Sequence, residues 1–265
     1  MFKVIVRVII VLVAFLTVLK AFAEDMTMRI VYNNIAYDKE LTCGWGMGCV
    51  IEGLEKTILF DTGGDGTILL SNMERMGINP EEIDIVVLSH IHGDHTGGLR
   101  AFLNSNPDVT VYLPASFPSD FKSGVCRQGA RIVEISKPVE IIPDVYSTGE
   151  LGTWIREQAL IIRSVEGLVI VTGCAHPGII NIAKKAIQIL DDDIYLITGG
   201  FHLGGASNRE IQRVMSELKA LGVKKIAPSH CTGDRVIKHF KNAWGHNFLE
   251  GGCGAYINVL ISTTS

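Results

Sequence analysis

The chain is predicted to be a mixed α/β protein with layered sheets. Its first third contains strand-like segments joined as hairpins, and the rest alternates short apolar β-branched runs with helical patterns. The chain has 265 residues, 47 % of them hydrophobic, which is enough to bury a large core. Because residues 24–265 contain no sequence repeat or evident linker, we expect a single domain there.

The expected strands are short runs rich in branched aliphatic residues. They are Met28–Ile35, Cys49–Glu52, Lys56–Phe60, Ile83–Leu88, Thr110–Leu113, Leu160–Arg163, Leu168–Thr172, Ile194–Thr198 and Lys225–Ala227. The expected helices have apolar residues at helical spacing, as in Asn208–Leu221, where Ile211, Val214 and Leu218 lie on one face. The other expected helices are Thr67–Met76, Thr96–Asn104, Gly178–Leu190 and Asp234–Lys241.

The first 23 residues have the pattern of a secretory signal peptide. Lys3 and Arg7 precede an almost wholly apolar run, Val8–Leu19, and the small-x-small triplet Ala21–Ala23 provides a cleavage site. The run is too short to cross roughly 30 Å of hydrocarbon comfortably. We therefore expect export to the periplasm or beyond and a mature chain without a stable membrane span. An uncleaved anchor is the alternative, because Lys20 interrupts the pattern.

Charge and cysteine content exclude two further classes. The net charge of −4 and the lack of a basic cluster argue against a nucleic-acid partner. Six cysteines are too few for a disulfide scaffold in a chain of this length, although Cys43 and Cys49 are close enough in sequence to pair.

The strongest chemical signal is the segment His-Ile-His-Gly-Asp-His at residues 90–95, directly after a buried strand. Three imidazoles and one carboxylate lie within six residues on a glycine-containing turn. Imidazole nitrogen and carboxylate oxygen are ligands that suit Zn²⁺ and its first-row neighbours. We expect His90 and His92 to bind one metal ion, and Asp94 and His95 to bind a second.

The pattern His90-x-His92-x-Asp94-His95 resembles the signature of the metallo-β-lactamase superfamily. Three further motifs are similar to one branch of it, described as dihydropterin or ribofuranosylaminobenzene 5′-phosphate synthase-like metal-dependent hydrolases. These motifs are Thr172–Ile179, Gly199–Leu203 and Pro228–Gly233. The resemblance covers about residues 28–260. It implies a four-layer αββα sandwich with mixed sheets and with the metals at one edge.

Residues outside the first motif are expected to complete the site. Asp61, in Phe-Asp-Thr-Gly, looks like the family's upstream aspartate and is expected to orient a metal-binding histidine. An ordinary turn aspartate is the alternative. His176 and His230 each lie where a predicted strand passes into a helix, an edge that collects ligands in α/β sheets. We expect His176 to complete the first metal site and His230 the second.

Cys174 departs from the family pattern. Most hydrolases of the superfamily have an aspartate there that bridges two metals. A thiolate can bind zinc but is softer, so Cys174 is either a metal ligand or a small buried residue. The segment Ser147–Glu150 also lacks the histidine that the family usually carries upstream. Both departures argue against β-lactam hydrolysis.

Two more residues and several glycines bear on the substrate. His202, in a glycine-rich loop, is expected to contact the substrate or to protonate the leaving group, and Cys231 is expected to line the site. Glycines precede several predicted helices, and helix N-termini near the metals would favour a phosphate or carboxylate. Tight turns alone are the alternative explanation for these glycines.

Together these expectations describe an exported metal-dependent hydrolase acting on a small anionic substrate. Two divalent cations, Zn²⁺ or else Mn²⁺ or Fe²⁺, would share a hydroxide that Asp94 orients, and His202 would serve the leaving group. The alternatives are an iron-dependent oxidoreductase of the same fold that acts on persulfides, a ribofuranosylaminobenzene 5′-phosphate synthase-like enzyme, and a metal binder without catalysis.

Overall fold

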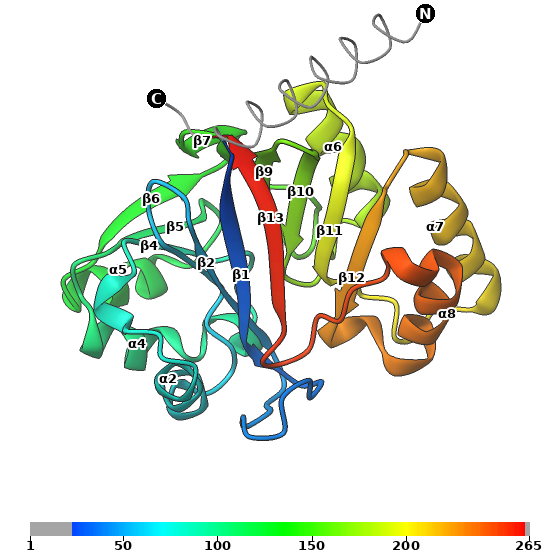
Figure 1. Ribbon diagram of the computed structural model, residues 1–265. Coiled ribbons are helices and arrows are strands. Elements are labelled where there is room, and N and C mark those ends of the chain that lie inside the picture. Colours follow the sequence, from blue (N-terminus) through cyan, green and yellow to red (C-terminus); the bar gives the residue numbers. More distant parts are fainter. Residues whose placement is uncertain (1–22, 263–265) are drawn as a thin grey trace, which may run out of the picture.

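The computed structural model describes residues 23–262, which form an αββα sandwich (Figure 1). Two mixed sheets face each other and helices cover both outer faces, so the predicted fold class is confirmed. The predicted signal peptide lies outside the described residues, apart from Ala23 at the start of the first strand. Within residues 23–262 no helix has the length and apolar character needed to cross a membrane.

The first sheet has seven strands in the order β13-β1-β2-β3-β4-β5-β6. Their bounds are β1 (Ala23–Asn33), β2 (Met47–Glu52), β3 (Ile58–Phe60), β4 (Ile85–Val87), β5 (Thr110–Pro114), β6 (Arg131–Ile135) and β13 (Tyr256–Ser262). The strands β13, β1, β2 and β3 pair antiparallel, as the predicted hairpins require, and β3 to β6 pair parallel.

The second sheet has six strands in the order β12-β11-β10-β9-β8-β7. Their bounds are β7 (Val139–Ile142), β8 (Val145–Ser147), β9 (Leu160–Ser164), β10 (Gly167–Thr172), β11 (Ile194–Gly200) and β12 (Lys225–Ser229). The strands β10, β11 and β12 are parallel. Their carboxyl ends therefore meet at one edge, from which the chain passes into loops and helices.

The helices follow the strands in chain order. They are α2 (Gly66–Arg75), α3 (Gly93–Thr96), α4 (Leu99–Ser105), α5 (Ser119–Arg127), α6 (Ile179–Leu190), α7 (Asn208–Ala220) and α8 (Asp234–Trp244), with short 3₁₀ turns η1 (Pro80–Glu82), η2 (His230–Thr232) and η3 (Gly245–Asn247). In Figure 1, α2, α4 and α5 lie beside the first sheet, and α6, α7 and α8 beside the second.

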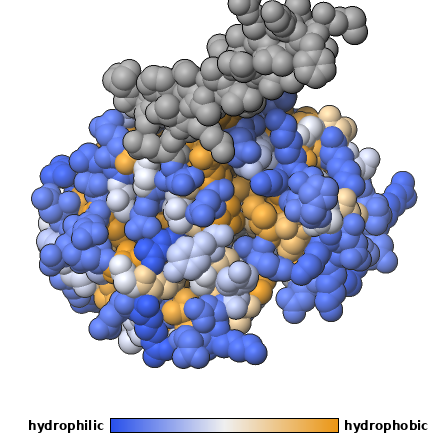
Figure 2. All heavy atoms as spheres, in the orientation of Figure 1, coloured by the Kyte–Doolittle hydropathy of each residue, from blue (hydrophilic) through white to orange (hydrophobic). Residues whose placement is uncertain are grey.

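Alternating side chains hold the layers together. In the fully buried strand β10, Leu168 and Ile170 pack against the outer helices, while Val169 and Val171 pack against the other sheet. This alternation is what a strand covered on both faces requires. Hydrophilic residues cover both helical layers on the face shown in Figure 2, and apolar residues show between them.

Several elements differ from prediction. The predicted helix Thr96–Asn104 is divided, since α3 ends at Thr96 and α4 begins at Leu99; between them Gly98 N donates to Gly63 O at 3.1 Å, outside the helix. Glycine is needed at Gly97 and Gly98, where a Cβ would meet backbone oxygens at 2.4 and 2.1 Å. The strands β6, β7, β8 and β13 and the helix α5 were not expected. Cys43 and Cys49 do not form the disulfide that their spacing allows, since both are free thiols and Cys49 is buried in β2.

Candidate metal centre

Loops from both sheets bring the predicted site residues together at one edge of the sandwich. The segment after β4 carries four of them, two in a loop and two in α3, and the segments after β10 and β12 carry the others. The imidazole rings of neighbouring members lie 4.2–5.1 Å apart between centroids. The assembled set is His90, His92, Asp94, His95, Cys174, His176 and His230. Residues 140 positions apart in sequence, His90 and His230, therefore converge on one place.

The first group of ligand atoms gathers around His90. His90 Nε2 lies 3.1 Å from His92 Nδ1, and ligand atoms of His90, Cys174 and His176 lie within 4.8 Å of one another. His176 Nε2 is buried and finds no hydrogen-bond partner among residues 23–262. Burial and neighbouring imidazoles lower the pKa of His90, and burial lowers that of His176 to about 4. Both rings are therefore neutral near pH 7, the form that binds a metal.

The second group gathers around Asp94. Its Oδ2 lies 3.2 Å from His230 Nε2 and 3.6 Å from His95 Nε2. His230 Nε2 is buried and has no hydrogen-bond partner of good geometry in the described part of the chain. Burial opposes ionisation of Asp94, but His230 and His95 outweigh it and lower the pKa of Asp94 to about 2. Asp94 is therefore a carboxylate at neutral pH.

Cys174 belongs to both groups. Its Sγ lies 3.3 Å from His95 Nε2, and the second set of ligand atoms within 4.8 Å of one another belongs to His95, Cys174 and His230. A third set, Cys174, His202 and Cys231, adjoins it. A hydrogen bond with Cys231 and burial raise the pKa of Cys174. A cation bound here would have to displace the thiol proton.

These residues fit the binding of divalent cations. A buried imidazole nitrogen without a partner costs free energy. The two such histidine nitrogens among residues 23–262 are His176 Nε2 and His230 Nε2, and they belong one to each group. The lone pair of His90 Nε2 faces another imidazole nitrogen at 3.1 Å, a contact that a shared cation makes favourable. Nitrogen, oxygen and sulfur donors together suit Zn²⁺.

Outer partners orient the histidines. The buried carboxylate of Asp61 accepts hydrogen bonds from His95 Nδ1, Ser89 N and Ser89 Oγ, all at 2.7 Å. Because Ser89 Oγ donates to Asp61, it accepts from His90 Nδ1 at 2.9 Å. His230 Nδ1 donates to Asn34 Oδ1 at 2.7 Å. Each Nδ1 proton thus points outward, and each Nε2 lone pair faces the centre.

Asp61 therefore has the position expected of it. Its effect on the pKa of His95 outweighs the effect of burial. Burial alone would lower the pKa of His95, but the carboxylate of Asp61 raises it. Gly173 makes room for this network, since a Cβ there would lie 2.1 Å from Ser89 Oγ and 3.0 Å from Asp61 Oδ2.

Glu157 is a buried carboxylate that the sequence did not reveal. Its Oε1 accepts from Cys174 N at 2.9 Å and Ala175 N at 2.8 Å, and its Oε2 accepts from His176 N at 2.8 Å. Burial raises the pKa of Glu157, and the three N–H groups oppose that rise. Glu157 thus holds the backbone that carries Cys174 and His176. Because it binds backbone rather than a motif side chain, no local sequence pattern marks it.

Backbone strain is concentrated at the centre. Asp61, Ala175, His202 and His230 have φ between 50° and 59°, a left-handed conformation that is unfavourable for residues with a Cβ. Such positions persist where surrounding contacts determine the backbone, and they cluster at functional sites.

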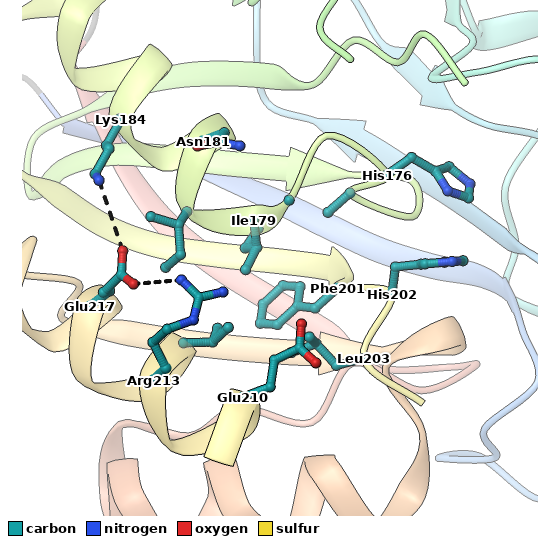
Figure 3. Close-up of a pocket in the computed structure, with 14 residues that line it drawn as sticks. His176, Ile179, Asn181, Lys184, Phe201, His202, Leu203, Glu210, Arg213 and Glu217 are labelled. Carbon is teal, nitrogen blue, oxygen red and sulfur yellow. Dashed lines mark hydrogen bonds and ion pairs between the residues drawn. The ribbon is translucent and has the colours of Figure 1, made fainter. Parts of the chain in front are cut away.

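His202 and Cys231 lie at the side of the centre. The His202 ring is 4.3 Å from that of His176 between centroids, and both residues line a cavity of about 440 Å³ (Figure 3). A hydrogen bond with Cys231 raises the pKa of His202. The exposed imidazole of His202 thus stands between the centre and the cavity.

A four-layer αββα sandwich with a histidine-rich centre at its edge defines the metallo-β-lactamase fold. Residues 49–181 match the metallo-beta-lactamase superfamily, and the chain belongs to that superfamily. It is 31 % identical over 261 residues to 7,8-dihydropterin-6-methyl-4-(beta-D-ribofuranosyl)-aminobenzene-5'-phosphate synthase of Methanocaldococcus jannaschii, covering 80 % of this chain and 89 % of the relative. The resemblance to this branch is confirmed.

Solved structures share the fold. Tm1679, a metal-dependent hydrolase of the beta-lactamase superfamily, superposes with a TM-score of 0.75 at 24 % identity, covering 88 % of this chain and 99 % of that chain. The short form of human tRNase Z superposes with a TM-score of 0.60 at 12 % identity, covering 88 % and 99 %. These likenesses establish the arrangement of the elements.

Replacing Glu157 with glutamine should weaken metal binding. An amide turns one acceptor oxygen into a donor, which then faces a backbone N–H of the Cys174–His176 loop. We expect the zinc affinity, measured by competition with a chromogenic chelator, to fall by about 10–100-fold. Glu150→Gln is the matched control, since Glu150 accepts a bond from Ser116 N, outside the metal-binding loops. Equal zinc affinity in both variants would contradict this role of Glu157.

Two histidines of the centre should make the metal-free chain less stable in acid. An unfolded histidine titrates at about pH 6.5. The lowered pKa values of His90 and His176 mean that the unfolded chain binds more protons below that pH, so stability falls on acidification. The raised pKa of His95 means that its contribution, full below pH 6.5, is lost as the pH rises through the folded pKa.

Urea unfolding of the metal-free protein at pH 4.5 and 6.5 measures the acid limb. His176→Gln should reduce the loss by on the order of 1 kcal/mol, a figure discounted because His176 is partly exposed. The same acid loss in the variant and the parent would refute the assignment.

Proposed function

We propose that this chain is a metal-dependent hydrolase that acts on a small phosphate- or carboxylate-bearing substrate. The observation that carries the proposal is the pair of ligand groups that share Cys174 and leave two buried imidazole nitrogens without partners. When bound there, two divalent cations would supply water activated at neutral pH and would polarise the scissile bond. His90, His92 and His176 would hold one cation, and Asp94, His95 and His230 the other, with Cys174 between them.

Asp94 and His202 have complementary protonation states. The lowered pKa of Asp94 keeps it ionised, so its carboxylate can orient an attacking water and accept a hydrogen bond from it. The raised pKa of His202 keeps a proton available at the mouth of the cavity, where it can be given to a leaving group. Asp94 lies in α3, after β4 of the first sheet, and His202 lies in the loop after β11 of the second, so a substrate would bind between the sheets' ends.

A synthase reaction is the second candidate, and the 31 % identity to a methanogen synthase favours it. The name of that relative includes a 5'-phosphate, which supports an anionic substrate here. The same centre could position a substrate for bond formation if water were excluded.

The predicted signal peptide supports export, and we propose a periplasmic or secreted hydrolase on that basis. Secretion of a tagged full-length chain, followed by N-terminal sequencing, tests this localisation.

Loss of either ligand group should abolish hydrolysis without unfolding the chain. We expect His92→Ala and Asp94→Ala to lower turnover of a phosphodiester, lactone or thioester substrate by at least about 1000-fold, because each removes a ligand from one site. His246→Ala, which changes an exposed histidine on η3, should keep full activity. Metal analysis and circular dichroism accompany each assay. Undiminished turnover in either ligand variant, with metal content confirmed, would defeat the proposal.

A further inference from the structure

A cavity extends from the metal centre between two helices of the outer layer. It lies between the first two turns of α6 and the stretch of α7 from Glu210 to Glu217, and it has a volume of about 440 Å³, a size that holds a small organic molecule. His176 and His202 stand at one end (Figure 3). A molecule that reacts at the centre could therefore place its remaining part in this cavity.

The lining changes character with distance from the centre. Ile179, Phe201 and Leu203 form an apolar wall next to the two histidines. Lys184, Arg213 and Glu217 lie at the opposite end, where dashed lines in Figure 3 join them. The cavity therefore matches a molecule with an apolar middle and a charged end.

The two cationic side chains at the far end of the cavity, Lys184 and Arg213, keep free hydrogen-bond donors. Arg213 Nη1 lies 2.7 Å from Glu217 Oε1, so one donor of the guanidinium group is used. Lys184 Nζ lies 3.8 Å from Glu217 Oε2, beyond hydrogen-bond distance. The side chains of Lys184 and Arg213 are 58 % and 60 % exposed, and ion pairs so solvated are weak. An incoming anion can therefore share both cations with Glu217.

A second acidic residue, Glu210, lies beside Leu203 and Phe201, between the histidines and Arg213 (Figure 3). Its carboxylate accepts hydrogen bonds and repels negative charge. A ligand that is anionic along its whole length would therefore fit poorly. From the metal centre outward, the cavity therefore presents an apolar wall that includes one acceptor, Glu210, and then the cationic side chains of Arg213 and Lys184.

We propose that this cavity binds the part of the substrate beyond the reacting bond, and that this part has an apolar ring or chain ending in an anionic group held by Arg213 and Lys184. A hydroxyl or amino group on the middle of the molecule would meet Glu210. The inference rests on the proposed function, since the reacting group is taken to lie at the metal centre. Arg213 and Lys184 would then determine specificity.

Two phosphonates that differ by one carboxylate test this proposal without turnover. The probes are phenylphosphonate and 4-carboxyphenylphosphonate, titrated calorimetrically into the zinc-loaded full chain. The carboxylated probe should bind about tenfold more tightly, as one charge-assisted contact provides. Arg213→Gln and Lys184→Gln should each reduce that advantage, and Glu217→Gln should increase it by removing a competing carboxylate.

Matched controls lie on the same helices. Lys185→Gln and Arg209→Gln remove neighbouring cations that do not line the cavity, and each should keep the full advantage. Equal affinity for the two probes, failure of both to bind, or an advantage unchanged in Arg213→Gln and Lys184→Gln would overturn the inference. A carboxylate advantage without any hydrolysis would refute the proposed function alone, and hydrolysis without the advantage would refute the inference alone.

Discussion

The buried hydrogen bonds of Asp61 are the interaction on which the centre depends. A carboxylate without water is costly unless its oxygens are hydrogen-bonded, and Asp61 meets that requirement with Ser89 and His95. Glu157 does the same for the loop from the second sheet. The two halves are joined next to Glu157, where Gln158 N donates to Ser89 O at 2.9 Å. Two buried carboxylates therefore hold the metal-binding loops in register before any cation arrives.

Cys174 adds a sulfur donor to this centre. Where most hydrolases of the superfamily have a bridging aspartate, a thiol lies between the two ligand groups and beside Cys231. Thiolate favours soft or borderline metals, so a cation bound by Cys174 would be Zn²⁺ or Fe²⁺ in preference to Mn²⁺. The strained backbone at Ala175 and His230 places these groups, and strain of about 1–3 kcal/mol per residue is tolerable only in so well connected a region.

Most of the fold and most of the candidate metal ligands could be predicted from the sequence, for different reasons. The strands β10 and β11 are long apolar runs, and His90 to His95 form a dense ligand motif, so local patterns suffice for both. The strands β6 and β7 were missed because exposed residues interrupt their apolar pattern. Asn34 and Glu157 were missed because they act through contacts that exist only after folding. Whether each ligand binds a metal stays a prediction.

Anomalous diffraction at the zinc edge, from crystals of the zinc-loaded chain, tests the central claim most directly. We expect two peaks, one bounded by His90, His92 and His176 and the other by Asp94, His95 and His230, with Cys174 Sγ between them. A single peak, or a peak held instead by Cys174, His202 and Cys231, would contradict a two-metal centre.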